Sequence, residues 1–114
     1  MNALAVTSDG QHIISGSMDR LVKVWSVATK SLVITCTGHT AVVDAVAAMP
    51  DGQRILSGGD DRGTVRVWLL NGTLENTFEL HTDGVEAVAA LPDNQHALSG
   101  SRDFTVKLLS LIHI

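Results

Sequence analysis

Tyrosine is absent from this 114-residue chain, aromatic residues make up only 4% of it, and there is a single cysteine. A folded core must therefore be built mainly from Val, Leu, Ile and Ala. One cysteine, Cys36, excludes an intrachain disulfide and a zinc site made of thiolates. It follows a strand-like run at residues 33–35, and we interpret it as a small apolar core residue.

Clustered positive charge and long apolar runs are also missing. The eight Lys and Arg residues are spread along the chain and the net charge is −4, so we predict no nucleic-acid partner. No apolar run has membrane-spanning length, and Asp9 and His12 interrupt any signal peptide. No phosphate loop, paired-histidine motif or reactive-cysteine environment is visible. We expect no cofactor, no metal and no membrane, and a reducing, cytoplasmic compartment.

What the chain does contain is an internal repeat with a step of 42 residues. A third-strand segment at 21–25 (Leu-Val-Lys-Val-Trp) returns at 64–68, displaced by the inserted Gly63, and again at 105–109. The most regular motif is a tetrapeptide with Ser-Gly at its centre, found as Ile14-Ser15-Gly16-Ser17, Leu56-Ser57-Gly58-Gly59 and Leu98-Ser99-Gly100-Ser101.

Each repeat shows the signals of short strands and tight turns. In the middle repeat, the pattern predicts strands at Val43–Ala48, Arg54–Ser57, Thr64–Leu69 and Leu74–Phe78. Turn residues such as Pro, Asp, Asn and Gly separate these runs. No segment has the 3.6-residue period of a helix. A four-stranded antiparallel meander of this length is typical of a propeller blade.

The middle repeat carries Gly38-His39, Ser57-Gly58, Asp61 and the run Val65-Arg66-Val67-Trp68 in that order. In these residues the chain resembles the WD-repeat proteins, whose blade signature runs from a Gly-His pair to a Trp-Asp pair. The resemblance covers roughly residues 2–110. It departs from the signature after the tryptophan, where the chain has Ser26 or Leu69 in place of Asp.

The resemblance implies an all-β fold, a partial β-propeller of three WD-repeat blades, each a four-stranded antiparallel meander. We expect blade 1 at 1–37 without its preceding loop, a complete blade 2 at 38–80, blade 3 at 81–110 without its fourth strand, and a tail at 111–114. Closed propellers have four to eight blades, so three cannot close a ring. Two interpretations stay open: a fragment of a longer chain, or a homo-oligomer that closes a ring.

His39, Ser57 and Asp61 have the residue types of a Ser-His-Asp catalytic site. The resemblance implies instead that they form, with Trp68, a buried hydrogen-bonded tetrad that joins the strands of the blade. Repetition favours this structural interpretation, because an active site occurs once per protein and a joint once per blade. Leu109 replaces the tryptophan in blade 3, which we therefore expect to be the weakest joint. The tetrad positions of the other blades are Ser15, Asp19, Trp25, His81, Ser99 and Asp103.

The resemblance also implies where a partner binds: at the loops before each first strand and the turns between second and third strands. Here these positions vary between repeats, as expected of a functional surface on a repeated scaffold. Their carboxylates predict an acidic surface, relieved by Arg102, for a partner segment with basic residues; ordinary solvated charge is the alternative. This candidate face comprises Asn2, Met18, Val42, Asp44, Asp60, Gly84, Glu86 and Arg102.

Three functions remain for comparison with the structure. The first is a non-catalytic scaffold for protein–protein interaction. The second is a serine hydrolase that uses His39, Ser57 and Asp61. The third is a propeller that binds small ligands or sugars near its central channel, but its loops supply Thr40, Ala41 and similar residues rather than aromatic and amide side chains. We expect no enzyme activity.

Overall fold

The computed structural model describes residues 3–37, 39, 41–60, 63–79 and 81–110, and all regular secondary structure in these ranges is β-strand. The strands form three antiparallel sheets that follow one another along the chain. The predicted all-β class, with consecutive propeller-like meanders, is confirmed. Each described sheet pairs its strands in simple sequence order, so neighbouring strands within a sheet are joined by hairpins.

The first blade consists of β1 (Ala3–Val6), β2 (His12–Gly16), β3 (Leu21–Ser26) and β4 (Leu32–Thr37). The second consists of β5 (Val43–Ala48), β6 (Arg54–Gly59), β7 (Thr64–Leu69) and β8 (Leu74–Glu79). The third consists, within the described residues, of β9 (Val85–Ala90), β10 (His96–Ser101) and β11 (Val106–Ser110).

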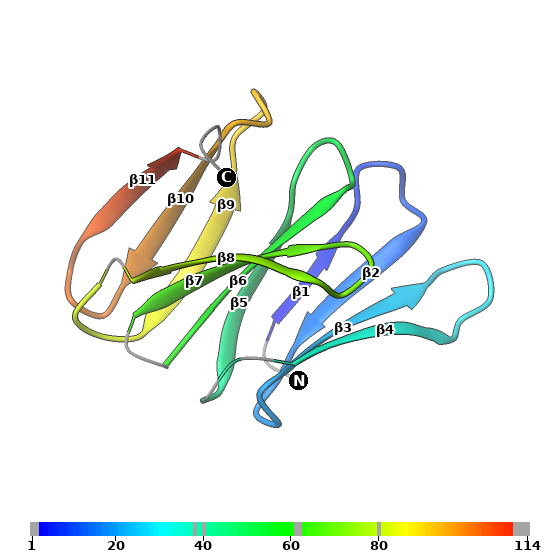
Figure 1. Ribbon diagram of the computed structural model, residues 1–114, viewed down its shortest axis with the longest axis horizontal. Helices are drawn as coiled ribbons and strands as arrows, with labels where there is room; N and C mark the ends of the chain where they lie inside the picture. Colours follow the sequence, from blue (N-terminus) through cyan, green and yellow to red (C-terminus); the bar gives the residue numbers. More distant parts are fainter. Residues whose placement is uncertain (1–2, 38, 40, 61–62, 80, 111–114) are drawn as a thin grey trace.

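The three blades stack in chain order, so that the middle blade lies between the other two (Figure 1). Their first strands are neighbours: β5 packs against β1 on one side and against β9 on the other. The later strands of each blade extend outward from these first strands, so that β4 and β8 form the outer edges of their sheets (Figure 1). The second strand of each of the first two blades also packs against the first strand of the next blade.

Two apolar clusters fill the spaces between the blades. Because side chains alternate across a strand, some side chains of blade 2 pack against blade 1 and others pack against blade 3. Complete burial of a Val, Leu or Ile side chain stabilises a fold by about 1.5–3 kcal/mol, so these clusters hold the blades together. The first consists of Ile14, Val22, Val24, Cys36, Val43, Val46, Ile55 and Trp68. The second consists of Met49, Leu56, Val65, Val67, Val85, Ala97 and Leu109.

The second strand of blade 2 is longer than its sequence predicts. We expected it to end at Ser57 with Gly58 and Gly59 in a turn, whereas β6 continues through both glycines. Gly58 pairs with Ala45 and Gly59 with Val43, across an irregularity in β5. The glycines serve close packing here: a methyl group added at Gly58 would lie 2.5 Å from a methyl carbon of Val85 in the next blade.

The turns between first and second strands repeat one backbone conformation. Gly10, Gly52 and Asn94 occupy the same place in the three blades, with φ of 72°, 68° and 61°. Asparagine replaces glycine in the third because it tolerates this left-handed conformation better than other side chains. The turns also link neighbouring blades, since Asn94 Nδ2 donates to Oδ2 of Asp51 over 2.8 Å.

Candidate functional site

The polar cluster of the middle blade is centred on the hydroxyl of Ser57. Nε2 of His39 lies 2.5 Å from Ser57 Oγ, and the indole N–H of Trp68 donates to the same oxygen over 2.8 Å. The three side chains are buried, with Ser57 completely inaccessible. Arg66 Nη1 lies 3.0 Å from Nδ1 of His39. The remaining predicted member, Asp61, lies outside the described residues.

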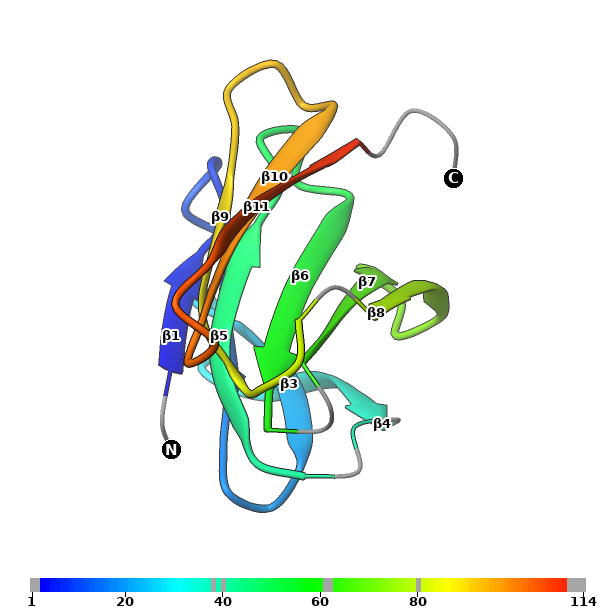
Figure 2. The same ribbon diagram turned by 90° about the vertical axis from the view of Figure 1, so that its left-hand side faces the viewer.

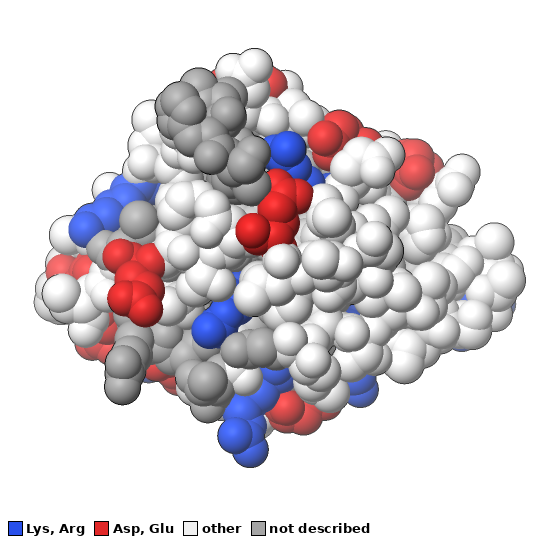
Figure 3. All heavy atoms as spheres, in the orientation of Figure 1, with Lys and Arg blue, Asp and Glu red and all other residues white. Residues whose placement is uncertain are grey.

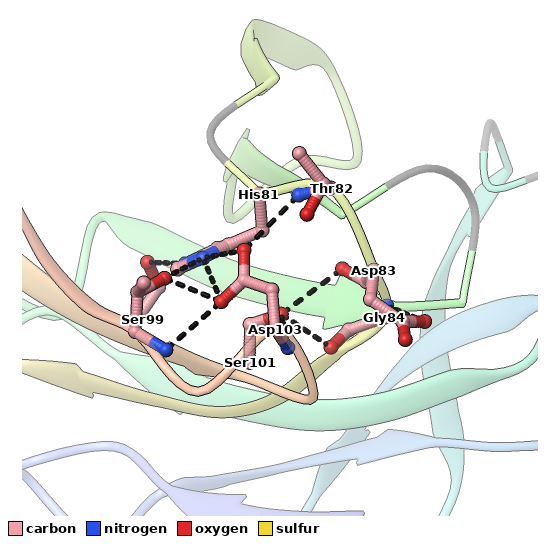
Figure 4. Close-up of polar contacts among 8 residues, drawn as sticks. His81, Thr82, Asp83, Gly84, Ser99, Ser101 and Asp103 are labelled. Carbon is pink, nitrogen blue, oxygen red and sulfur yellow. Dashed lines mark hydrogen bonds and ion pairs between the residues drawn. The ribbon is translucent and has the colours of Figure 1, made fainter.

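The third blade has a similar cluster built around His81 (Figure 4). Its Nε2 lies 2.7 Å from Ser99 Oγ, and its Nδ1 lies 3.0 Å from Oδ2 of Asp103 and 2.9 Å from Oγ1 of Thr105. Asp103 also accepts the hydroxyl of Thr105 and the backbone N–H groups of Thr82 and Thr105. The Thr105 hydroxyl, followed by these N–H groups, holds the pKa of the Asp103 carboxyl well below its ordinary value.

Ser99, His81 and Asp103 thus have the connectivity of a Ser-His-Asp catalytic site. Their burial argues for a different role, because the Ser99 residue is only 1% exposed and the His81 side chain is fully buried. A nucleophile must reach a substrate carbonyl, and this hydroxyl is covered. The same His–Ser contact also recurs between His39 and Ser57. Leu109 is buried in the position of the missing tryptophan and offers no donor to Ser99.

In the first blade the structure brings together only part of the predicted set. Trp25 Nε1 donates to Ser15 Oγ over 3.0 Å, as in the middle blade. Asp19 is directed elsewhere: it accepts the hydroxyl of Ser17 and a backbone N–H of its own turn. It also forms an exposed ion pair with Lys23 at 3.6 Å. Among the described residues, nothing connects Asp19 with the Ser15–Trp25 pair.

On the candidate face, the structure gathers three predicted carboxylates around the guanidinium of a fourth predicted residue, Arg102. Arg102 Nε lies 2.9 Å from Glu86 Oε1, its Nη1 lies 3.0 Å from Asp60 Oδ1, and its Nη2 lies 3.7 Å from Asp44 Oδ2. Asp44 and Asp60 belong to blade 2, whereas Glu86 and Arg102 belong to blade 3. We call these four residues the Arg102 cluster. It bridges two blades and carries three acidic groups against one basic group.

Negative charge is in excess at the Arg102 cluster. Burial raises the pKa of the Asp44 carboxyl, and the neighbouring Asp60 carboxylate raises it further, while Arg102 opposes both effects. Oδ2 of Asp44 is inaccessible and has no hydrogen-bond partner among the described residues. The side chains of Arg102 and Glu86 are about half exposed, at 46% and 56%. The cluster is therefore accessible from solvent and incompletely neutralised.

The other predicted contact residues lie apart from this cluster or are covered. Met18 is 69% exposed in the turn between β2 and β3, and Val42 is half-buried beside Asp44. Gly84 is buried, because a methyl group added there would lie within 2.3 Å of Oδ1 of Asp60. Gly84 thus presents no side chain and little open surface in this structure, and its role in partner contact stays a prediction. Asn2 lies outside the described residues.

Sequence reasoning missed one exposed aromatic residue on the candidate face. Phe104 is 99% exposed, in the same β10–β11 turn as Arg102. The equivalent positions of the other repeats are Arg20 and Arg62, so an aromatic residue that replaces arginine was a visible signal. An exposed aromatic side chain next to charged groups is typical of interaction surfaces.

On the face shown in Figure 3, Lys and Arg side chains lie in separate small groups and do not form one basic patch. Within the described ranges, no group of His, Cys, Asp and Glu side chains could hold a metal ion. No helix in the described part of the chain is long and apolar enough to cross a membrane. A groove of about 440 Å³ between the outer strands of blades 1 and 2 contains His12, Gln53 and Asn71.

Comparison with known families agrees with this architecture. The model of the WD40 family, described as "WD domain, G-beta repeat", matches residues 1–26, 30–68 and 72–110. The chain therefore belongs to the WD-repeat family, whose members generally act as scaffolds that bind other proteins. The second and third matched segments each begin with the last strand of one blade and end with the third strand of the next. Each of these two repeats therefore links two blades covalently.

Proposed function

We propose that this chain is a non-catalytic scaffold that binds a basic segment of another protein at the Arg102 cluster. The observation that carries the proposal is the set of three carboxylates, from Asp44, Asp60 and Glu86, that share one guanidinium. A Lys or Arg side chain of a partner would find carboxylate oxygens that Arg102 leaves partly uncompensated. Burial raises the pKa of Asp44 most, and the neighbouring Asp60 carboxylate raises it further, so part of this effect comes from the crowding of negative charge at the cluster.

The cluster's position also supports binding. It bridges blades 2 and 3 at the candidate face, so its geometry rests on two packed sheets and needs little ordering when a partner binds. Phe104, exposed in the same turn as Arg102, adds an aromatic contact beside the charges. A segment that combines basic and apolar residues would therefore match this surface better than a purely charged one.

The test is a fluorescence-anisotropy titration with two labelled peptides of equal length. One alternates Arg with Leu, and the other has Ser in place of every Arg. We expect the basic peptide to bind more tightly, and the difference to shrink between 50 mM and 500 mM salt because the charges are exposed. Equal binding of the two peptides would refute a preference for basic segments.

Variants of the chain locate the binding surface. Each exposed charge pair contributes up to about 1 kcal/mol, so Asp60→Asn combined with Glu86→Gln should weaken the basic peptide about fivefold or more. Asp93→Asn is the matched control, because Asp93 is an exposed carboxylate in a turn between first and second strands. If the control weakens binding as much as the double variant does, the attraction comes from net charge and the proposed site is wrong.

The hydrolase alternative has its own test. A fluorophosphonate probe labels serine nucleophiles that are activated and accessible. The burial of Ser57 and Ser99 supports the expectation that neither is labelled in the folded protein. Stoichiometric labelling of either serine, located by peptide mass spectrometry, would overturn the non-catalytic assignment.

A further inference from the structure

Three glycines occupy the same place in the second strand of each blade: Gly16, Gly58 and Gly100. At the first two, the next blade fills the space in front of the glycine. A methyl group added at Gly16 would lie 2.5 Å from Cγ1 of Val43, and one added at Gly58 would lie 2.5 Å from Cγ1 of Val85. These separations are far shorter than any packed contact. At Gly16 and Gly58, the absence of a side chain thus leaves a depression in the sheet that aliphatic side chains from the first strand of the following blade fill. We call each such depression a glycine seat.

In the part of the chain that the structure describes, the third seat is empty. A methyl group at Gly100 would meet, among these residues, only Ala87 Cβ in its own sheet, at 4.0 Å. A groove of about 200 Å³ opens in front of it, lined by apolar side chains that include Ala89, Leu98 and Val106. Figure 2 views the molecule from this side, with the sheet of β9, β10 and β11 toward the viewer. Exposed Val106 and Leu108 extend the apolar surface along β11.

The opposite end of the molecule carries the side chains that fit such a seat. Leu4 pairs with Ser15 in the register in which Val46 pairs with Ser57 and Val88 with Ser99. Val46 and Val88 both pack against the preceding blade, the former next to Gly16 and the latter next to Gly58. Among the described residues, no preceding blade covers Leu4, which is 60% exposed, as is Val6 on the same face of β1.

We propose that a second copy of this chain docks head to tail, so that its β1 places Leu4 in the Gly100 groove of the first. The inference goes beyond the binding of a basic segment and rests on the repeat itself, which covers the same surface twice within one chain. Head-to-tail contacts form a closed ring when the rotation per subunit permits it. Two copies give six blades, within the usual range of four to eight, whereas three would give nine.

The first experiment is light scattering after size exclusion, at several concentrations of the purified chain. We expect a species of twice the chain mass of 12.1 kDa. Gly100→Val should abolish it, because the new side chain fills the seat. This variant should still fold, since the groove gives the added atoms room within its own chain. Leu4→Asp should also abolish the dimer, because it places a charge on the side chain that enters the groove. Leu74→Asp, on the outer strand of the middle blade, is the control and should leave the dimer intact.

Mixing the two dissociated variants gives the sharpest result. Gly100→Val keeps a free Leu4, and Leu4→Asp keeps a free Gly100 groove, so the pair retains one intact interface. We expect a one-to-one heterodimer from the mixture and none from either variant alone, with far-ultraviolet circular dichroism confirming that both are folded. A wild-type chain that stays monomeric at high concentration would overturn the proposal. So would an assembly that persists unchanged in both variants.

Discussion

The middle and third blades carry nearly the same repeat in very different surroundings. In β7, Val65 and Val67 are completely buried, whereas their counterparts in β11, Val106 and Leu108, are 74% and 63% exposed. The side chains are equally apolar, so sequence does not set the difference. Blade 3 covers the middle blade, and no described element covers the corresponding face of blade 3. Stability in this fold is therefore a property of blade pairs more than of single blades.

The polar clusters of these two blades differ as well. Ser57 accepts from the indole of Trp68, whereas the residue at the tryptophan position of the third blade is Leu109, which has no donor to offer Ser99. The third blade instead surrounds its histidine with Asp103 and the hydroxyl of Thr105. The two blades thus satisfy the same buried His–Ser pair in different ways. Each variant below is compared in the Leu4→Asp background, so that association of two copies does not contribute.

The largest expected effect comes from making the middle blade resemble the third. Trp68→Leu removes a fully buried indole and its hydrogen bond to Ser57, and should lower the free energy of unfolding by about 3 kcal/mol. Trp25→Leu in blade 1 is the matched control. Trp25 is only half-buried, so its replacement should cost less than half as much. Urea denaturation measures both, and equal losses would show that burial between blades is not the deciding factor.

A second comparison uses the glycine seats. Gly58→Ala places a methyl group 2.5 Å from Val85 and should cost about 2 kcal/mol through overpacking. Gly100→Ala adds the same group where the nearest atom is 4.0 Å away, and should change stability by less than about 0.5 kcal/mol. Thermal denaturation of the two variants gives the answer. A large loss at Gly100 would mean that its seat is already filled within one chain.

The third blade should contribute to acid sensitivity through Asp103. Its pKa is lowered in the folded state, so it stabilises the fold above the ordinary carboxyl pKa of about 4. That contribution is lost as pH falls below 4 toward the folded-state pKa. Asp103→Asn should therefore destabilise the chain at pH 7 and flatten the fall in urea midpoint between pH 4 and pH 2. An unchanged pH profile in this variant would show that the His81 cluster does not depend on the carboxylate charge.

The smallest expected effect is an increase in stability from a substitution in the third blade. Phe104 adopts φ of 69°, a left-handed conformation that disfavours most side chains, and its ring is almost fully exposed. Phe104→Asn should raise the free energy of unfolding by about 0.5 kcal/mol, because asparagine tolerates this conformation. Phe104→Ala should bring no such gain. If Phe104→Asn instead destabilises the protein, the ring packs against the fold in solution.

The sequence predicted the parts of this structure that repeat. The strands of the middle blade follow from period-two alternation and turn residues. Two ends were predicted too short: β8 continues by one residue to Glu79, and β6 continues by two because Gly58 serves packing rather than turning. The candidate face was chosen residue by residue, and three of its carboxylates meet at a fourth member, Arg102. Their roles in binding remain predictions, as does the structural role of the tetrads.

The sequence did not reveal features that depend on contacts between repeats. Gly84 looked like any variable loop residue, although Asp60 covers it in the fold. Asp19 matched the tetrad pattern, but it accepts the hydroxyl of Ser17, while Ser15 accepts from Trp25. Among the described residues, no histidine bridges Asp19 and Ser15. The sequence has the same glycine in all three repeats, so it does not show that valines of the next blade pack against Gly16 and Gly58 while the space in front of Gly100 stays open. Such differences arise from what lies beside each blade, which local pattern does not encode.

Native-state hydrogen exchange, followed by mass spectrometry, tests the central claim most directly. In the Leu4→Asp variant, where no second copy covers β9–β11, backbone amides of β6 and β7 should exchange much more slowly than those of β10 and β11. The reason is that, within the described ranges, neighbouring blades cover the middle blade on both faces and the third blade on only one. Equal protection of the two blades would contradict the account, because stability would then reside in each repeat and not in the contacts between them.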